Sequence, residues 1–146
     1  MTRPPIGIGG FSLPHRKDTG MENLASIEIK AFIPSKDFQL SQAFYQDMGF
    51  ERKSAGHGVA YFAHGNCSFL LQDYYHPEFA ANCMMHLLVA DAAAWHAQLQ
   101  RRGIAEKYQV MLGDLKHQPW GMLDFPLLDP SGVLWHIAQN LPRNAD

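Results

Sequence analysis

Two stretches of this chain resemble each other at a fixed separation. Asp37 and Gly49 lie 12 residues apart, and the same aspartate–glycine spacing recurs 54 positions later at Asp91 and Gly103. In both copies the aspartate follows a short apolar run and the glycine precedes an apolar residue. An internal repeat of this length predicts two similar supersecondary units stacked on each other, with a ligand pocket between or beneath the pair.

Hydrophobic periodicity gives each copy the same order of elements: one strand, one helix and three further strands. Residues 26–33 alternate and are rich in Ile and Phe, which predicts a strand. An amphipathic helix follows from Asp37 to Gly49 with Leu40 on its apolar face, and a second helix runs from Asp91 to Gly103. The remaining predicted strands are residues 51–54, 59–63, 68–74, 84–89, 108–111, 122–127 and 133–138, with a connector at 76–82.

One helix per unit covers only one face of a sheet, so the other face is free to curve around a cavity. We therefore expect an α+β fold in which two βαβββ repeats form a curved mixed sheet around that cavity. A chain of 146 residues with 47% hydrophobic residues is long enough for one domain with a real core. We expect an N-terminal arm at residues 1–24 and one domain at 25–142, with repeats at about 25–80 and 82–140.

Composition excludes several classes of protein. The net charge is −2 with His neutral, and no cluster of Lys and Arg predicts a nucleic-acid partner. No apolar stretch approaches the ~20 residues of a membrane span, and the N-terminus lacks the apolar core of a signal peptide. The two cysteines, Cys67 and Cys83, fit reduced thiols, so we expect a cytoplasmic protein.

Two motifs give the chain a family resemblance. The sequences FYQDMGF at 44–50 and DPSGVLWHI at 129–137 resemble the vicinal oxygen chelate superfamily, which includes glyoxalase I, extradiol dioxygenases and bleomycin resistance proteins. The sequences IPSKDF at 33–38 and QPWG at 118–121 are similar to the bleomycin-resistance type. Members of that type are dimers that bind the drug in crevices at the subunit interface without chemistry. The resemblance implies a homodimer and a small-molecule ligand here.

The resemblance also allows the metal site of the superfamily's enzymes to be examined. Those enzymes hold a divalent ion through the first and last strands of each repeat, at positions that we count here as Lys30, Phe69, Met84 and His136. Only the histidine is a usual ligand for Zn, Mn, Ni or Fe, and an ammonium group repels a cation. We therefore expect no metal cofactor.

A displaced metal site is the alternative. Side chains two residues apart on a strand share a face, so Glu28, His86 and His136 are an alternative ligand set for Zn, Mn, Ni or Fe. With that set the protein would be a metal-dependent lyase, similar to lactoylglutathione lyase, or a dioxygenase. A histidine inside an apolar strand is, however, more often a hydrogen-bonded core residue.

The candidate ligand-binding residues are mainly apolar and aromatic. They are Phe32, Tyr61, Phe69, Met84, Trp120 and His136. Trp120 lies in the Pro–Gly-flanked QPWG segment, where an indole stacks on an aromatic or cationic ligand, fills the cavity itself or packs at a dimer interface. For Phe69 and Met84 a place in the core competes with a place in the pocket.

The sequence thus favours a small-molecule binding protein that sequesters an antibiotic or another planar amphipathic ligand without chemistry. The displaced-site enzyme is one alternative. The other is an interaction or scaffold domain without a small ligand.

Overall fold

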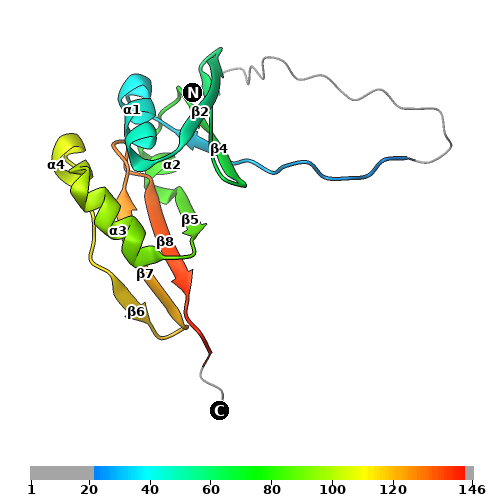
Figure 1. Cartoon of the computed structure of the whole chain (residues 1–146). Helices are drawn as coiled ribbons and strands as arrows, with labels where there is room; N and C mark the ends of the chain where they lie inside the picture. Colours follow the sequence, from blue (N-terminus) through cyan, green and yellow to red (C-terminus); the bar gives the residue numbers. More distant parts are fainter. Residues whose placement is uncertain (1–21, 144–146) are drawn as a thin grey trace.

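The computed structural model describes residues 22–143, which form two four-stranded mixed sheets with helices packed on one side of each (Figure 1). In chain order the elements are β1 (Phe32–Pro34), α1 (Phe38–Met48), β2 (Glu51–Gly56), β3 (Val59–His64), β4 (Cys67–Gln72), α2 (Pro77–Asn82), β5 (Met84–Leu88), α3 (Ala92–Arg101), α4 (Ile104–Tyr108), β6 (Lys116–Gln118), β7 (Met122–Leu128) and β8 (Leu134–Asn140).

The two sheets follow one plan. Sheet A has the strand order β1-β4-β3-β2 and sheet B has the order β5-β8-β7-β6. In each, the first strand of the repeat runs parallel to the last strand, and the other neighbours are antiparallel. The predicted fold class of two βαβββ repeats is therefore confirmed.

Helix α1 begins and ends where the sequence predicts. The Asp37 side chain accepts a hydrogen bond from the Leu40 backbone N–H at 3.1 Å, and Gly49 ends the helix at a φ of 119°, which favours glycine. The predicted apolar face is partly wrong, because the Leu40 side chain is 42% exposed. A helix turns every 3.6 residues, so a spacing of four drifts around its surface, and Tyr45 shares the buried side with Met48.

The first strand is shorter than predicted. Alternation in residues 26–33 indicates extended backbone, but a strand also needs a hydrogen-bonded neighbour. The ladder with β4 pairs only Phe32, Ile33 and Pro34 of this segment. Residues 22–31 instead form an extended arm outside this ladder, drawn in blue in Figure 1, and near Glu28 the arm still contacts sheet A. The part of the predicted arm at residues 1–21 lies outside the described residues.

Two connections also differ from the prediction. The strand expected at 108–111 is wrong: α4 follows Gly103, whose φ of 63° reverses the chain after α3 and lets a second helix begin. In place of the strand expected at 108–111, sheet B contains β6, at Lys116–Gln118, as its antiparallel edge strand. The connector expected at 76–82 contains α2, which begins with Pro77 in its first turn, where the missing N–H costs nothing.

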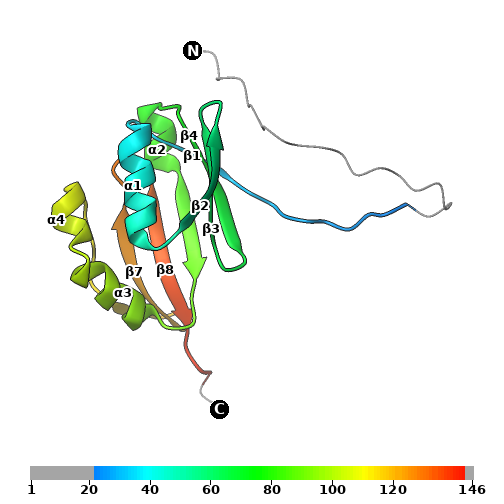
Figure 2. The same ribbon diagram turned by 45° about the horizontal axis from the view of Figure 1, so that its top comes forward.

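A buried hydrogen-bond network joins the two repeats. Tyr45 Oη on α1 donates to Asp129 Oδ2 at 2.5 Å, and Trp135 Nε1 on β8 donates to Tyr45 Oη at 3.0 Å. Asp129 Oδ1 accepts the backbone N–H groups of Ser131 and Val133 in the β7–β8 turn. Figure 2 shows α1 of the first repeat standing beside β7 and β8 of the second. The helix-covered faces of the two sheets therefore pack into one common core.

The charge state of this network follows from its burial. Burial, and then the nearby Asp129 charge, raise the pKa of Tyr45 well above its ordinary value, so the phenol keeps its proton and acts as the donor. Burial also raises the pKa of Asp129, against the opposing effect of the hydrogen bonds that it accepts. The carboxylate therefore depends on its donors to remain buried.

A second, more exposed contact links α1 to the α3–α4 segment. Asp47 Oδ2 accepts hydrogen bonds from Lys107 Nζ at 2.6 Å and from Tyr108 Oη, and Arg102 Nη1 donates to the Asp47 carbonyl at 2.7 Å. Partial burial acts to raise the pKa of Asp47, but the bonds from Lys107 and Tyr108 outweigh it, and the pKa lies below its ordinary value of 3.8.

Replacing Tyr45 by Phe should lower the free energy of unfolding by about 1–3 kcal/mol, because Asp129 then stays buried without its phenol donor. Urea denaturation followed by circular dichroism measures the loss. Tyr75→Phe is the matched control, since among the described residues its hydroxyl makes no hydrogen bond. An unchanged unfolding free energy in Tyr45→Phe would contradict the structural role of the network.

Replacing Asp47 by Asn should make the protein less stable at neutral pH. It should also reduce the loss of stability that the protein shows as the pH falls. A carboxyl whose folded pKa is lowered stabilises the fold above its unfolded pKa, about 3.8, and loses that contribution as the pH falls through the folded pKa. The side chain is partly exposed, so we expect a loss of less than about 1 kcal/mol. Thermal melts between pH 3 and 7 measure it, with the exposed Asp73→Asn as control. A difference between Asp47→Asn and wild type that grows towards acid pH would contradict this assignment.

Candidate functional site

The face of sheet B opposite the helices is open. Strand alternation places His86 of β5, His136 of β8 and Pro126 of β7 on this face, where His86 and His136 are register partners and Pro126 pairs with His136. A cavity of about 610 Å³ opens here, within the roughly 300–1,000 Å³ range of small-molecule sites. Its lining residues are His86, Gly113, Asp114, Lys116, Gln118, Trp120, Asp124, Pro126 and His136.

The floor of the cavity depends on a close backbone approach. Gly113 donates its N–H to the Pro126 carbonyl at 2.9 Å, and a Cβ at position 113 would lie 2.5 Å from Pro126 Cγ. Only glycine allows this contact without displacement of the proline ring. The buried His96 of α3 is hydrogen-bonded through Nε2 to the Gly113 carbonyl at 2.9 Å, so the helix side of the sheet fixes the floor.

The rim carries the most exposed aromatic ring of the site. Gln118, Pro119, Trp120 and Gly121 form the β6–β7 turn, closed by the Gly121 N–H on the Gln118 carbonyl at 3.0 Å. Gly121 has a φ of +84°, which glycine tolerates best. Trp120 is 66% exposed and lines the cavity, so its ring face is available to a ligand.

A carboxylate lies inside the cavity. Asp124 is 7% exposed and accepts a hydrogen bond from Gln118 Nε2 on Oδ1 at 2.8 Å. Its register partner on β6 is Lys116, which also lines the cavity. Within residues 22–143 the Lys116 ammonium forms no ion pair with Asp124.

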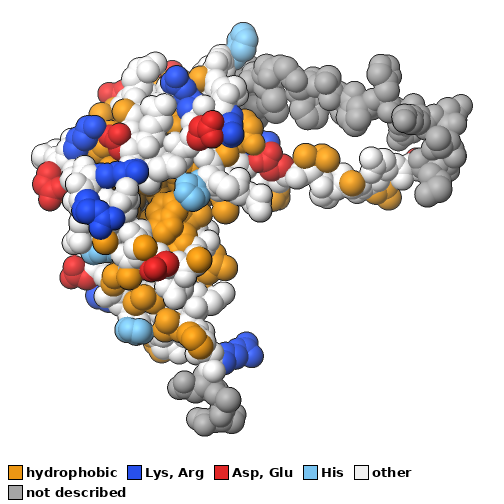
Figure 3. All heavy atoms as spheres, in the orientation of Figure 1, with side chains coloured by type: hydrophobic (Ala, Val, Ile, Leu, Met, Phe, Trp, Pro, Cys, Tyr) orange, Lys and Arg blue, Asp and Glu red, His pale blue; other side chains and the backbone are white. Residues whose placement is uncertain are grey.

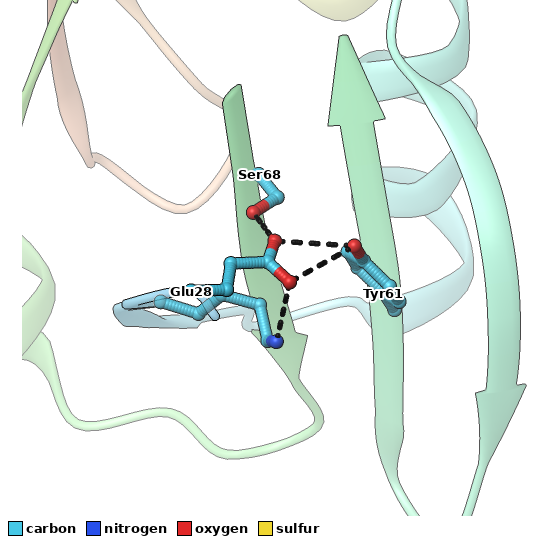
Figure 4. A network of polar contacts seen from close by, with 4 residues as sticks. Glu28, Tyr61 and Ser68 are labelled. Atoms are coloured by element: carbon cyan, nitrogen blue, oxygen red, sulfur yellow. Dashed lines mark hydrogen bonds and ion pairs between the residues drawn. The ribbon is translucent and has the colours of Figure 1, made fainter. Parts of the chain in front are cut away.

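The predicted residues Phe32 and Tyr61 lie on sheet A rather than at this cavity. Figure 4 shows Glu28, at the root of the arm, held on sheet A: it accepts from Tyr61 Oη at 3.1 Å, from Ser68 Oγ and from Lys30 Nζ at 3.0 Å. The Ser68 hydrogen bond and then the Lys30 hydrogen bond lower the pKa of Glu28 below its ordinary value. The Glu28 carboxylate is therefore already hydrogen-bonded on the open face of sheet A.

Phe69 and Met84 do not line the cavity. Phe69 is fully buried on the helix side of sheet A, with its ring centroid 4.8 Å from that of Tyr45 and 5.5 Å from that of Trp135. The predicted role for Phe69 is thus corrected to a core position. Met84 is exposed on β5, an edge strand of sheet B, on the same face as His86 but outside the cavity lining.

The repeat count for the last strands was shifted by one residue. Phe32 pairs with Leu70 in sheet A as His86 pairs with His136 in sheet B, and Phe32 is 54 positions before His86. The counterpart of His136 is therefore Leu70 and not Phe69. A shift of one residue moves a strand side chain to the opposite face, which explains the misplaced phenylalanine.

No cluster of metal ligands is present in the described part of the chain: no group of three His, Cys, Asp or Glu side chains lies close enough to hold an ion. The residues that pair between the first and last strands are Phe32 and Leu70 in sheet A, which are not ligands, and His86 and His136 in sheet B. The alternative ligand set is divided, because Glu28 is bonded on sheet A.

Most of the lining could not be found from the sequence, because it depends on β6. Alternation along MLDFPLL at 122–128 was enough to place Asp124 and Pro126 on one face. The short polar β6 carries no hydrophobic period, so nothing indicated that Lys116 and Gln118 lie beside Asp124.

Comparisons with known proteins agree with the fold. No protein-family model matches the sequence, and no curated protein matches it. A solved bleomycin-binding protein in complex with bleomycin is 25% identical over 79% of this chain and 99% of its own, with a TM-score of 0.68. A bleomycin resistance determinant encoded on the transposon Tn5 is also 25% identical, over 79% and 98% of the two chains, with a TM-score of 0.69.

An enzyme shares the architecture as well. Lactoylglutathione lyase from Agrobacterium tumefaciens is 16% identical over 79% of this chain and 95% of its own, with a TM-score of 0.57. The fold is therefore shared by binding proteins and a lyase, and the function has to be argued from the cavity. In the described part of the chain no helix is long and apolar enough to cross a membrane.

Proposed function

We propose that this protein, whose fold is that of the vicinal oxygen chelate superfamily as the sequence predicted, is a small-molecule binding protein that sequesters an antibiotic or a similar planar, amphipathic molecule without chemical change. The observation that carries the proposal is the cavity on sheet B with Trp120 exposed at its rim. The similarity to a bleomycin-binding protein and to a bleomycin resistance determinant supports this class of ligand.

The chemistry of the cavity supports binding. An indole with a free face stacks on planar rings and attracts cations, and the nearby Pro126 ring and glycine floor offer an apolar surface. Histidine, lysine and carboxylate groups at the lining provide the few polar contacts that orient a ligand in such sites. The net charge of −2 favours encounter with a cationic molecule.

One feature of the cavity favours the enzyme as second candidate. His86 and His136 face it as register partners, so two imidazoles stand side by side. A catalytic divalent ion usually takes three protein ligands, and the described residues offer no third donor beside this pair. The binding function is therefore the better supported of the two.

We further propose that the protein is a homodimer. The extended arm carries Ile27 and Ile29, which are 92% and 95% exposed, and they continue the row of the core residue Ile33. Figure 3 shows hydrophobic side chains along the described part of the arm. Exposed apolar side chains of this kind, aligned with a core residue of the same segment, favour burial against another chain. Leu88 on β5, also exposed, supplies apolar surface of the same kind.

Trp120→Ala should abolish ligand-induced stabilisation. A saturating ligand of the bleomycin kind, at about 100 times its Kd, adds roughly 2.7 kcal/mol of apparent stability, or about 5–10 °C in the melting temperature. We expect bleomycin to raise the melting temperature of the wild type and to leave the melting temperature of Trp120→Ala unchanged. Phe79→Ala, at a partly exposed aromatic residue on α2, is the control and should respond as wild type does.

Two results would contradict the binding proposal. One is an equal response of Trp120→Ala and wild type to the drug. The other is stoichiometric Zn, Mn, Ni or Fe in protein purified without chelator, lost in His136→Ala, because this would favour the enzyme. No response to any drug or ion would favour the scaffold alternative.

Changing Ile27 and Ile29 to Ser together should weaken the dimer. Sedimentation equilibrium should give the wild type twice the 16.4 kDa of one chain, and the double variant should dissociate at least about ten times more readily, since two buried Ile side chains are lost from each arm. Leu40→Ser, at an exposed apolar position on α1, is the matched control. A monomeric wild type would overturn the proposal.

A further inference from the structure

Asp124 is a charged group buried without full compensation. It is 7% exposed, and its one hydrogen bond among the described residues goes from Gln118 Nε2 to Oδ1 at 2.8 Å. No fully buried side-chain oxygen in this part of the chain lacks a partner, so the unbonded Oδ2 must be reached from the cavity that Asp124 lines. A carboxylate oxygen in this position accepts a hydrogen bond from whatever occupies the cavity.

The neighbouring charges leave this oxygen available. Lys116 is the register partner of Asp124, yet its side chain is exposed and forms no ion pair with it in the described part of the chain. Asp114 also lines the cavity, so two carboxylates face one ammonium group there. A buried carboxylate with one neutral donor is costly unless a further donor, best a cationic one, completes its shell.

We propose that Asp124 binds a cationic nitrogen of the ligand, a primary ammonium or a guanidinium group, while the ligand's aromatic part stacks on Trp120. This rests on the proposed function, because it assigns a ligand class to the same cavity. Gln118 holds the carboxylate, and Gln118 and Trp120 belong to the same four-residue turn. The anion and the indole are therefore carried on one hairpin, which favours ligands that carry a cation near a planar ring.

The two oxygens of Asp124 have different surroundings. Asp129 directs both oxygens at protein donors, namely Tyr45 and the backbone of its own turn. Asp124 uses one oxygen for the hairpin and presents the other to the cavity. Asparagine at this position would keep the bond from Gln118 and lose the charge, so it separates the two roles.

The test compares tryptamine with tryptophol, which share the indole ring but carry an ammonium and a hydroxyl group respectively. Titrations followed by amide chemical shifts in nuclear magnetic resonance give both dissociation constants. We expect wild type to prefer tryptamine by about tenfold, the scale of one charge-assisted hydrogen bond. Asp124→Asn should weaken tryptamine binding by about tenfold and leave tryptophol unchanged. The control Asp73→Asn, at an exposed carboxylate outside the cavity lining, should keep the wild-type preference.

The outcomes separate the two proposals. Equal affinity of wild type for the two probes, or an equal loss of both in Asp124→Asn, would overturn the role of Asp124 while leaving the cavity as a binding site. If neither probe shifts the amides that line the cavity, both proposals fail. Unchanged melting of Asp124→Asn in the absence of probe, measured beside the titrations, shows that a loss of binding is not a loss of fold.

Discussion

The hydrogen bonds among Tyr45, Asp129 and Trp135 hold the two repeats to each other. Each repeat has one helix-covered sheet face, and a unit of ~60 residues has only a marginal core alone. The network places a helix of the first repeat on the last hairpin of the second, so that the helix sides merge. Because these groups are buried, they are stable only as a complete set, which fixes one relative placement of the sheets.

That placement determines where a ligand can bind. Since the helix sides are shared, the opposite face of each sheet is left open, and on sheet B this face becomes the cavity. The floor depends on the core side of the same sheet, because His96 on α3 holds the Gly113 carbonyl. The site is thus an outer surface whose shape is set by packing behind it, and the β6–β7 turn at the rim supplies Trp120 and Gln118.

The sequence predicted much of the fold and part of the site. The caps at Asp37 and Gly49 and the turn at 129–132 are local, so their residue types were sufficient to place them. Trp120 was predicted as a ligand contact, and it lines the cavity with His136. Phe69 was misplaced, because the repeat count could not determine the strand register to one residue, and such a shift exchanges core and cavity.

By itself, the sequence determined the two-repeat plan and the positions of most strands and helices. These follow from short-range periodicity, capping and residue chemistry, which act within a few residues. Only the tertiary structure decided that β6 brings Lys116 and Gln118 beside Asp124, and that Glu28 is bonded on sheet A instead of facing His86. Such contacts depend on strand pairing between distant residues, and a single sequence does not encode that register locally.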